Sequence, residues 1–388
     1  MRKAKRILFL DHAAALGGAE RSLLLILERM DRTKWHPLLG CPEGALEKEA
    51  SRLSIETLNI EFPRLRRSWR AVSDLIKMTR EISRVAKERS VDLIYTNTVR
   101  TAIYASLVAR SSSCSFVWHM RDFWLSERKP GMPGLDRIGK RWIGARADAI
   151  LANSHAVAEH LPFSGKVNVV HNGVDPHRFQ PVENENRMKA RFGIPADRPV
   201  VGMAGRLRPW KGVDRLIRAA AVIGSRNPGA QFLVVGGSAF EVRDGYAESL
   251  PHLAAQLNIA DKVFFTGQLE DVRPALAAMD VFVHPGDPEP FGLVNIEAMA
   301  MGKPVVAFAH GALPEIVLDQ ITGILVPPGD LDALVSAVLA LLSSPEKAAE
   351  MGKAGRARVE AHFTARKMTD AIDALLSDLL AADQVPNV

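Results

Sequence analysis

A pair of glutamates around a loop is the first feature of the chain that indicates chemistry. In DPEPFGLVNIEAM (287–299), Glu289 lies between two prolines, which hold it in an extended loop, and Glu297 follows eight positions later among helix formers. In one continuous helix this spacing would set the carboxylates roughly 80° apart and two turns away. We therefore expect two separate contacts on either side of a helix N-terminus opened by Gly292, rather than an acid/base pair. A helix with an ordinary acidic first turn is the alternative.

The loop GRLRPWKG (205–212) is a second candidate, because it follows a predicted strand directly and opens a helix. Gly205 permits a tight turn, and Arg206 and Lys211 would lie at the loop mouth near the helix N-terminus. Free amides and two cations in such a place suit a diphosphate. The alternative is a solvated basic loop. The loop matches neither the Walker A motif nor the dinucleotide-binding G-x-G-x-x-G.

LGGAERS (16–22) occupies the corresponding place in the first half, between the first predicted strand and the first helix. Gly17 and Gly18 allow the backbone to approach a ligand closely. Glu20, near the start of the helix, also suits simple capping. A structural turn and a ligand loop remain equally open here.

FVWHMRDFW (116–124) places His119 and Arg121 at the end of a predicted strand, on the side where a cleft would lie. Strand ends of this kind carry ligand-binding residues in doubly wound sheets. A histidine there is either catalytic or packed and hydrogen-bonded, and the residues alone leave both open.

No stretch has the spacing of a metal site or of a catalytic triad. HGALPEI (310–316) again places a glycine and an acid, Glu315, where a strand turns into a helix. Asp330-Leu-Asp332 resembles the Asp-x-Asp metal motif of some sugar transferases, but it follows PPG and begins a helical run. We therefore expect Asp330 to be an N-cap. There is no nucleophile-elbow G-x-S-x-G.

Short apolar runs alternate with longer helical patterns, which predicts parallel sheets with right-handed crossovers. The candidate strands of the first half are residues 6–12, 36–41, 55–60, 92–97, 116–120, 149–154 and 167–172. Those of the second half are residues 199–205, 230–237, 262–267, 280–285, 303–309 and 322–328, with helical segments at 211–224, 246–258 and 292–301. We expect an α/β fold of two facing, Rossmann-like doubly wound domains, with the active site in the cleft between them.

Length and composition agree with two domains. The chain has 388 residues, of which 47% are apolar and 24% charged, as in globular proteins with substantial cores. A polar, proline-containing stretch at 175–196 predicts the boundary, so we expect domains at 1–178 and 179–362. A C-terminal helix at 363–388 would pack back on the first domain. Two cysteines without metal-ligand spacing suit a reducing cytosol.

The sequence predicts neither a signal peptide nor a membrane span. The N-terminal apolar run, residues 7–10, is cut by Asp11 and His12 and predicts a first strand instead. No run reaches the ~18 apolar residues of a spanning helix. We therefore expect that the protein does not cross a bilayer.

Charge is distributed unevenly. Residues 1–180 hold 30 Lys and Arg against 19 Asp and Glu, whereas residues 181–388 hold 20 against 25. Residues 64–89 alone carry nine basic and three acidic side chains. This asymmetry indicates an anionic partner for the first half.

Taken together, these motifs resemble the GT-B glycosyltransferases, specifically the retaining family 4 group with its E-x7-E motif. The matching pieces are GGAE (17–20), His119, HNGVD (171–175), GRLRPWKG (205–212), EPFGLVNIE (289–297), GALPEI (311–316) and GILVPPGD (323–330). The resemblance implies a nucleotide sugar held mainly by the second domain and the acceptor by the first. It also implies transfer with retention by a front-face mechanism that needs no metal or other cofactor.

By the same resemblance, Arg206 and Lys211 would grip the donor diphosphate, and Glu297 would bind the ribose hydroxyls. Glu289 would bind the 3-hydroxyl of the sugar. Backbone amides of Phe291, Gly292, Leu293 and Val294 would contact the sugar and the distal phosphate. Gly18 would approach the phosphate when the domains close, and His119 would lie by the sugar near the reacting centre.

The donor and acceptor remain open within this family. A UDP-sugar is favoured over GDP-mannose, with an envelope glycan, glycolipid or small molecule as acceptor, and no nucleic acid is expected. A nucleotide-sugar-binding protein or an epimerase on the same fold is the alternative. The sequence lacks the fingerprint glycines of an NAD-dependent oxidoreductase, which argues against that class of enzyme.

Several members of this family dock on anionic membranes through a basic helix of the first domain. Here Leu65, Trp69, Val72 and Ile76 fall at helical spacing within residues 64–89. The alternative is a solvated helix that packs its apolar stripe on the sheet. We expect a cytoplasmic protein. The stretch 64–89 suggests that it attaches peripherally to the inner face of the membrane.

Overall fold

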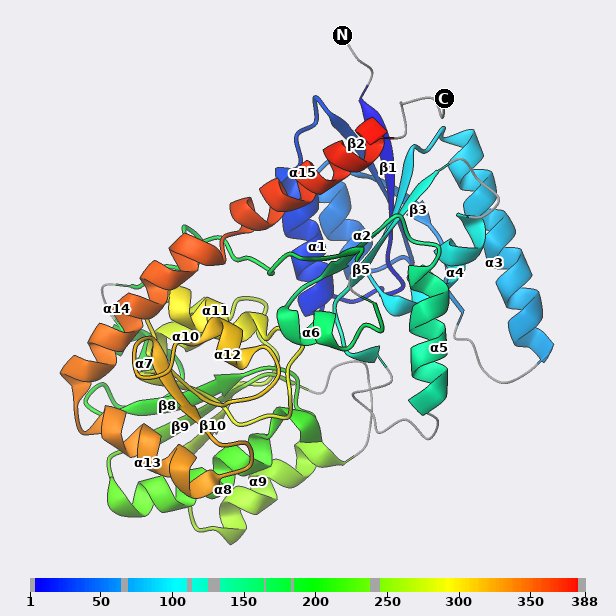
Figure 1. Ribbon diagram of the computed structural model, residues 1–388. Helices are drawn as coiled ribbons and strands as arrows, with labels where there is room; N and C mark the ends of the chain where they lie inside the picture. Colours follow the sequence, from blue (N-terminus) through cyan, green and yellow to red (C-terminus); the bar gives the residue numbers. More distant parts are fainter. Residues whose placement is uncertain are drawn as a thin grey trace. The chain divides into compact units, whose positions relative to one another are not determined.

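The computed structural model describes residues 4–63, 69–109, 114–124, 133–163, 165–182, 185–237 and 245–382, in two compact units. Residues 1–173 and 365–388 form the first unit, and residues 174–364 form the second (Figure 1). The sequence placed the boundaries at 178/179 and 362/363, a few residues from these divisions. Val174 pairs with Thr364 in a parallel bridge, so the two crossing segments run side by side.

The first unit contains a seven-stranded, wholly parallel sheet in the order β3-β2-β1-β4-β5-β6-β7. Its strands are β1 (Lys5–Leu10), β2 (Trp35–Cys41), β3 (Glu56–Asn59), β4 (Leu93–Thr96), β5 (Ser115–Met120), β6 (Ala149–Ala152) and β7 (Val167–Val169). The order reverses between β1 and β4. In doubly wound sheets ligands bind at the carboxyl ends of the strands at this reversal.

Helices cover both faces of this sheet (Figure 1). They are α1 (Gly18–Arg29), α2 (Ala45–Arg52), α3 (Trp69–Glu88), α4 (Val99–Val108), α5 (Pro133–Gly144), α6 (His155–Glu159) and α15 (Ala365–Ala382). Alternate residues of β1 point to opposite faces: Ile7 and Phe9 join the core under α1 and α15, and Leu8 and Leu10 join the core under α3 and α4. Both sets are fully buried, which is why the strands are continuous apolar runs.

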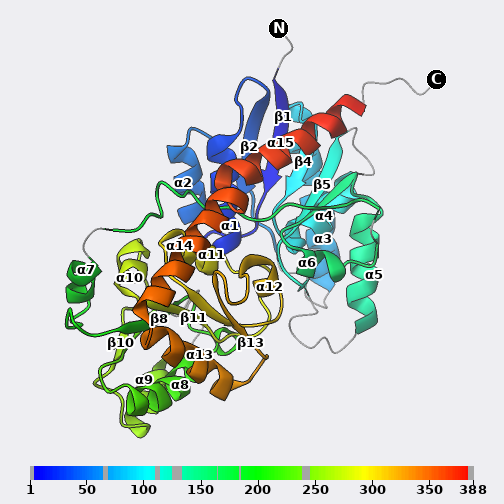
Figure 2. The same ribbon diagram turned by 60° about the vertical axis from the view of Figure 1, so that its left-hand side comes forward.

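The C-terminal helix α15 belongs to the first unit. It lies against α1, as the views of Figures 1 and 2 both show, and four apolar side chains spaced one helical turn apart enter the same core. These are Met368, Ile372, Leu376 and Leu380. Asp373 pairs with Lys34 and accepts a hydrogen bond from the Trp35 indole, which fixes the helix to the start of β2.

The second unit contains a six-stranded parallel sheet in the order β10-β9-β8-β11-β12-β13, and this order reverses between β8 and β11. Its strands are β8 (Val200–Ala204), β9 (Gln231–Val235), β10 (Val263–Phe265), β11 (Val281–His284), β12 (Val305–Phe308) and β13 (Gly323–Val326). Its helices are α7 (Glu185–Arg191), α8 (Val213–Arg226), α9 (Tyr246–Gln256), α10 (Arg273–Ala278), α11 (Leu293–Ala300), α12 (Leu313–Ile316), α13 (Leu331–Leu342) and α14 (Pro345–His362).

The strand predictions are confirmed: each of the thirteen candidate runs overlaps one of the described strands, and the described chain from Pro345 to Ala382 forms two helices, α14 and α15. Asp330 is the N-cap of α13, where its side chain accepts from the Ala333 amide at 2.9 Å. The stretch 175–196, in which the sequence predicted the domain boundary, holds helix α7, which was not predicted. Met188 and Phe192 pack on the core of the second unit, and Lys189 pairs with Asp280 at 2.9 Å. Because this stretch is polar, its sequence gives no apolar pattern that predicts the helix, which makes few apolar contacts.

The proposed membrane stretch is only partly described. Leu65 and the rest of residues 64–68 lie outside the described residues, as does the side chain of Trp69. In the described part of α3, Met78, Ile82 and Val85 face the core. None of the helices that the structure describes is long and apolar enough to cross a membrane.

Candidate functional site

In the second unit, the two loops that follow β8 and β11 meet at the reversal of the sheet. Residues 205–212 follow β8, and residues 285–292 follow β11, which is its neighbour in the sheet. These are two of the three loops that the sequence singled out in this unit. Parallel topology places them together because the carboxyl ends of adjacent strands open on one edge.

The contact between these loops leaves no space for side chains. Gly212 adopts φ +71°, and a Cβ there would lie 2.2 Å from the Pro285 carbonyl oxygen. A Cβ on Gly286 would lie 2.9 Å from the Trp210 carbonyl oxygen. The Asp287 amide donates to that same carbonyl at 2.7 Å. The two loops are therefore locked backbone to backbone, which fixes the side chains that they carry.

Lys211 and Glu289 form an ion pair across these loops. Both side chains are largely buried, with 14% and 11% of their surfaces exposed. Burial raises the pKa of Glu289, but the charge of Lys211, with His284 and Arg206 nearby, outweighs it and holds that pKa below its usual value. Arg206 itself is exposed. The site thus holds an ionised carboxylate beside two cations.

The third loop, HGALPEI, supports the backbone of Glu289. The Ala312 amide donates to the Glu289 carbonyl at 2.9 Å. Gly311 adopts φ +57°, and a Cβ there would lie 2.5 Å from the same carbonyl oxygen. His310 contacts the Gly286 carbonyl at 3.0 Å through Nε2. This motif therefore supports the loop that carries Glu289. The backbone carbonyl of Glu315 accepts a hydrogen bond from Arg358 at 2.7 Å.

His284, the last residue of β11, is a site residue that sequence reasoning missed. Its Nε2 lies 3.6 Å from Glu289 Oε1, and the ring is almost fully buried. Burial lowers the pKa of His284 to about 4, so the ring is neutral at pH 7. The only signal was its place at the carboxyl end of a strand, immediately before the loop that carries Glu289.

Helix α11 begins where the sequence expected. Gly292 is its N-cap with φ +85°, and the helix runs from Leu293, so the amides of Leu293 and Val294 have no partner within the helix. Phe291 is buried in the core beneath, which anchors the turn. Glu297 is the fifth helical residue and half-buried. Glu289 and Glu297 therefore flank the helix N-terminus, one on each element.

In the first unit, Gly18 is the first residue of α1 and Gly17 its N-cap. The Glu20 carboxylate accepts from the Gly17 amide at 2.8 Å. This hydrogen bond is the capping role that the sequence left open for Glu20. The role of Gly18 toward a phosphate stays a prediction.

His119 is the next-to-last residue of β5 and is fully buried. Its Nδ1 hydrogen-bonds the Tyr95 hydroxyl of the neighbouring strand β4. Its Nε2 has no hydrogen-bond partner among the residues that the structure describes. Burial, with a smaller contribution from Arg121, lowers the pKa of His119 well below its usual value, so the ring is neutral. The structure thus shows the packed, hydrogen-bonded reading for Nδ1, with Nε2 unsatisfied among the described residues, and a catalytic role of His119 stays a prediction.

Arg121 is the centre of a buried polar network at the sheet reversal of the first unit. Its guanidinium donates to Asn97 at 2.6 Å, to Ser22 at 2.8 Å and to Asn172 at 2.6 Å. Asn97 also donates to the fully buried Asp11 at 2.6 Å. Burial, and then the neighbouring Glu20, raise the pKa of Asp11 to about 7.

Sequence reasoning missed this network as a unit. Its signal was the polar residue placed directly after an apolar strand: Asp11 after β1, Asn97 after β4, and Arg121 after β5. Because these strands are parallel, residues at their carboxyl ends gather on one edge.

Metal-binding groups do not converge in either unit taken by itself. Among the described residues of each unit, no set of three His, Cys, Asp or Glu side chains lies close enough to share an ion. The expectation that transfer needs no metal stays a prediction. Cys41 is buried, and burial raises the pKa of its thiol to about 12. Cys41 and Cys114 are both free thiols.

Two family models match the chain, one for each unit. Residues 16–178 match the model described as "Glycosyltransferase Family 4", and residues 184–358 match "Glycosyl transferases group 1". Between them the models span most of the chain, and all the motif residues described above lie within them.

Curated relatives carry two kinds of name. A "GDP-mannose-dependent alpha-(1-6)-phosphatidylinositol monomannoside mannosyltransferase" of Mycolicibacterium smegmatis is 42% identical over 52% of this chain and 51% of its own length. A "D-inositol 3-phosphate glycosyltransferase" of Streptomyces avermitilis is 38% identical over 61% of this chain and 53% of its own length. The matches thus span about half the length of these relatives.

Solved structures match over the whole chain. The Anabaena protein Alr3699/HepE in complex with UDP-glucose has a TM-score of 0.85 and 27% identity, over 96% of this chain and 99% of the other. A sucrose-phosphate synthase from Thermosynechococcus elongatus has a TM-score of 0.83 and 25% identity, over 97% and 100%. With two parallel Rossmann-like sheets, a family 4 first unit and a group 1 second unit, the chain belongs to the GT-B glycosyltransferases.

Proposed function

We propose that this protein transfers a sugar, with retention, from a nucleotide sugar to a hydroxyl acceptor. The observation that carries the proposal is the Lys211–Glu289 ion pair beside Arg206 at the sheet reversal of the second unit, next to the first amides of α11. Cations and oriented amides at such a place bind a diphosphate. Arg206 and Lys211 are assigned to that diphosphate.

The ionised state of Glu289 defines what it can do. A carboxylate is a hydrogen-bond acceptor only, so Glu289 accepts from a sugar hydroxyl and does not protonate the leaving group. Glu297, on the next element, is assigned to the ribose hydroxyls. The amides of Phe291 to Val294 contact the distal phosphate and the sugar. Both glutamates are therefore positioning residues.

In the proposed reaction the bond between the anomeric carbon and the β-phosphate oxygen breaks, and a bond to the acceptor oxygen forms on the same face. The departing phosphate takes the acceptor's proton. Negative charge grows on the diphosphate as it leaves, and cations held in place beforehand stabilise it. Lys211 is held by its ion pair and by the locked loops, so it needs no rearrangement to do this. His119 and Gly18 of the first unit are assigned to the sugar and the phosphate.

The donor is best found by comparing the binding of different nucleotide sugars. The relatives' names include GDP-mannose, whereas the structural neighbour binds UDP-glucose. We retain a UDP-sugar as the first choice and GDP-mannose as the second. A thermal-shift screen should identify the donor, because ligand at 100 times its Kd stabilises by ~2.7 kcal/mol.

Transfer is then tested with the donor that binds. Release of the nucleoside diphosphate should occur slowly in water and faster with a glycolipid or glycan acceptor. NMR of the product should show the donor's anomeric configuration. An inverted product would contradict retention. Binding without release of diphosphate would support a nucleotide-sugar-binding protein, and interconversion of the donor without release would support an epimerase.

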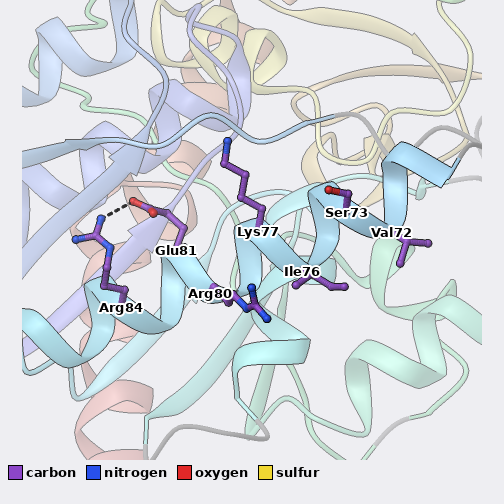
Figure 3. A pocket seen from close by; sticks show the side chains of 7 residues that line it. All are labelled: Val72, Ser73, Ile76, Lys77, Arg80, Glu81 and Arg84. Atoms are coloured by element: carbon purple, nitrogen blue, oxygen red, sulfur yellow. Dashed lines mark hydrogen bonds and ion pairs between the residues drawn. The ribbon is translucent and has the colours of Figure 1, made fainter.

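We also propose that α3 and α5 of the first unit rest on an anionic membrane surface where the acceptor is presented. Val72 and Ile76 of α3 are exposed, and they line a groove with Ser73, Lys77, Arg80, Glu81 and Arg84, of which Glu81 and Arg84 form an ion pair (Figure 3). On α5, exposed apolar and basic side chains are again interspersed: Leu135, Arg137, Ile138, Arg141 and Trp142. Exposed apolar groups among basic ones are typical of helices that bind lipid surfaces.

Vesicle flotation tests this surface. The protein should float with vesicles that contain phosphatidylglycerol and not with phosphatidylcholine alone. Ile76→Ser and Ile138→Ser should weaken flotation. Ile321→Ser, which removes an equally exposed isoleucine from the second unit, should not. Equal flotation of all three variants would contradict a role for α3 and α5.

A further inference from the structure

Tyr95 and His119 form a buried pair whose hydrogen bond has a direction. The two rings meet edge to face, with centroids 5.8 Å apart and planes at 78°, and the Tyr95 hydroxyl hydrogen-bonds Nδ1. Both residues are fully buried. Because His119 is neutral, only one of its ring nitrogens carries a proton, and the Tyr95 bond decides which one.

The surroundings of the Tyr95 hydroxyl settle the direction. In the described part of the chain, the other polar group that acts on it is the Arg121 guanidinium, which has donors and no acceptor. Burial keeps the hydroxyl protonated by raising the pKa of Tyr95. Among the residues that the structure describes, Nδ1 of His119 is therefore the acceptor for its proton. The positive guanidinium also disfavours a second donor, an Nδ1–H, pointing at the same oxygen.

We propose that Tyr95 is a positioning residue which holds His119 as the Nε2–H tautomer, so that His119 donates a hydrogen bond to an oxygen of the bound sugar. Nε2 is buried and lacks a partner among the described residues, and a buried N–H without a partner is costly unless a ligand satisfies it. His119 then acts as a donor and not as the base that takes the acceptor's proton. This inference rests on the proposed transferase function.

The tautomer can be read without any activity. In protein labelled with 13C and 15N histidine, NMR should show His119 neutral at pH 7 with its proton on Nε2. In Tyr95→Phe, which keeps the ring and removes the hydroxyl, His119 should become a mixture of tautomers. Tyr104→Phe is the matched control, since Tyr104 is also buried and loses a hydrogen bond of its hydroxyl, to Pro63, at 2.9 Å. A proton on Nδ1 in the unmodified protein, or an unchanged tautomer in Tyr95→Phe, would overturn the proposal.

The kinetic readout separates positioning from a merely structural role. With the donor found above, Tyr95→Phe should lower kcat about tenfold, with a KM for the donor within about twofold of the unmodified protein, because the oriented hydrogen bond counts most in the transition state. Tyr104→Phe should keep both values. An unchanged kcat in Tyr95→Phe would also overturn the proposal. If no nucleotide sugar is consumed by the unmodified protein, the transferase assignment fails instead, and the NMR result still decides the tautomer.

Discussion

The sheet reversals of the two units occupy the same place in the same topology, yet they hold charge in opposite ways. In the second unit, Lys211 pairs with Glu289 while Arg206 stays exposed beside them. In the first unit, Arg121 is buried, and neutral side chains such as Asn97 and Asn172 accept from its Nε and Nη1.

The arrangement in the second unit suits the binding of an anion, whereas the arrangement in the first unit connects the ends of neighbouring strands. Cations that keep hydrogen-bond donors near the surface can bind a phosphate with them, because little further desolvation of the cations is needed. Arg121 already donates through Nε and Nη1 to buried amides and a hydroxyl, so an anion could take these two donors only by breaking the network. The first unit therefore uses its reversal to hold β1, β4 and β5 in register around His119.

Removal of the Arg121 side chain should have the largest effect on folding. Arg121→Ala leaves Asn97, Ser22 and Asn172 with unsatisfied buried groups and removes a cation near Asp11, so the first unit should lose about 3–5 kcal/mol of unfolding free energy. Five of the six tryptophans lie in the first unit, so urea unfolding followed by tryptophan fluorescence reports mainly on it. Arg137→Ala, on exposed α5, should stay within about 0.5 kcal/mol. A loss below about 1 kcal/mol in Arg121→Ala would show that the network is not structural.

Lys211→Ala should instead affect catalysis most. Loss of the cation at the departing diphosphate should lower kcat about 100- to 1,000-fold, as for the removal of other preorganised transition-state contacts. Lys347→Ala, which removes an exposed lysine from α14, is the control and should leave kcat unchanged. Activity of Lys211→Ala within about threefold of the unmodified protein contradicts the assignment.

The two units should also differ in how their stability responds to pH. The folded pKa of Asp11 is about 7, above its ordinary value of 3.8, so between these values the folded chain binds the proton that the unfolded chain has lost. The contribution of Asp11 is then full below about pH 4 and falls as pH rises through 7, by roughly a few kcal/mol. Asp11→Asn should remove this fall in the fluorescence-detected transition. A slope that persists in Asp11→Asn would assign it to another group.

Glu297→Ala should have the smallest effect of these variants. Loss of a contact to the ribose hydroxyls should weaken donor binding about tenfold, which is about 1.4 kcal/mol, with kcat nearly unchanged. Isothermal calorimetry with the identified donor measures this directly. Glu346→Ala, on the exposed first turn of α14, controls for a general loss of negative charge. An unchanged Kd would remove Glu297 from the donor site.

Much of the fold and of the second unit's site could be predicted because their signals are local. Strands buried on both faces require runs of apolar residues, so β1 and β8 are visible in the sequence without any knowledge of their partners. Gly292 and Asp330 lie where a helix start needs them. The E-x7-E spacing and the GRLRPWKG loop likewise place their residues at strand-to-helix turns.

Helix α7 escaped prediction because its evidence is not local. Among its described side chains Met188 makes the core contact, and further support comes from its packing on α10 and from Lys189 reaching Asp280, 91 positions away. A short polar helix between prolines has too little periodicity to be distinguished from a linker.

The sequence by itself determined the strands, their parallel arrangement and the residue types at the turns, since apolar periodicity and backbone requirements act over a few neighbouring residues. Only the tertiary structure decided which side chains meet. Lys211 reaches Glu289 across 78 positions, Tyr95 reaches His119 across 24, and Ser22 reaches Asn172 across 150. The strand order brings these partners to one edge of each sheet, and it depends on how whole elements pack. These partners and burial then decide protonation: burial keeps His119 neutral, whereas the charge of Lys211 outweighs burial and keeps Glu289 ionised.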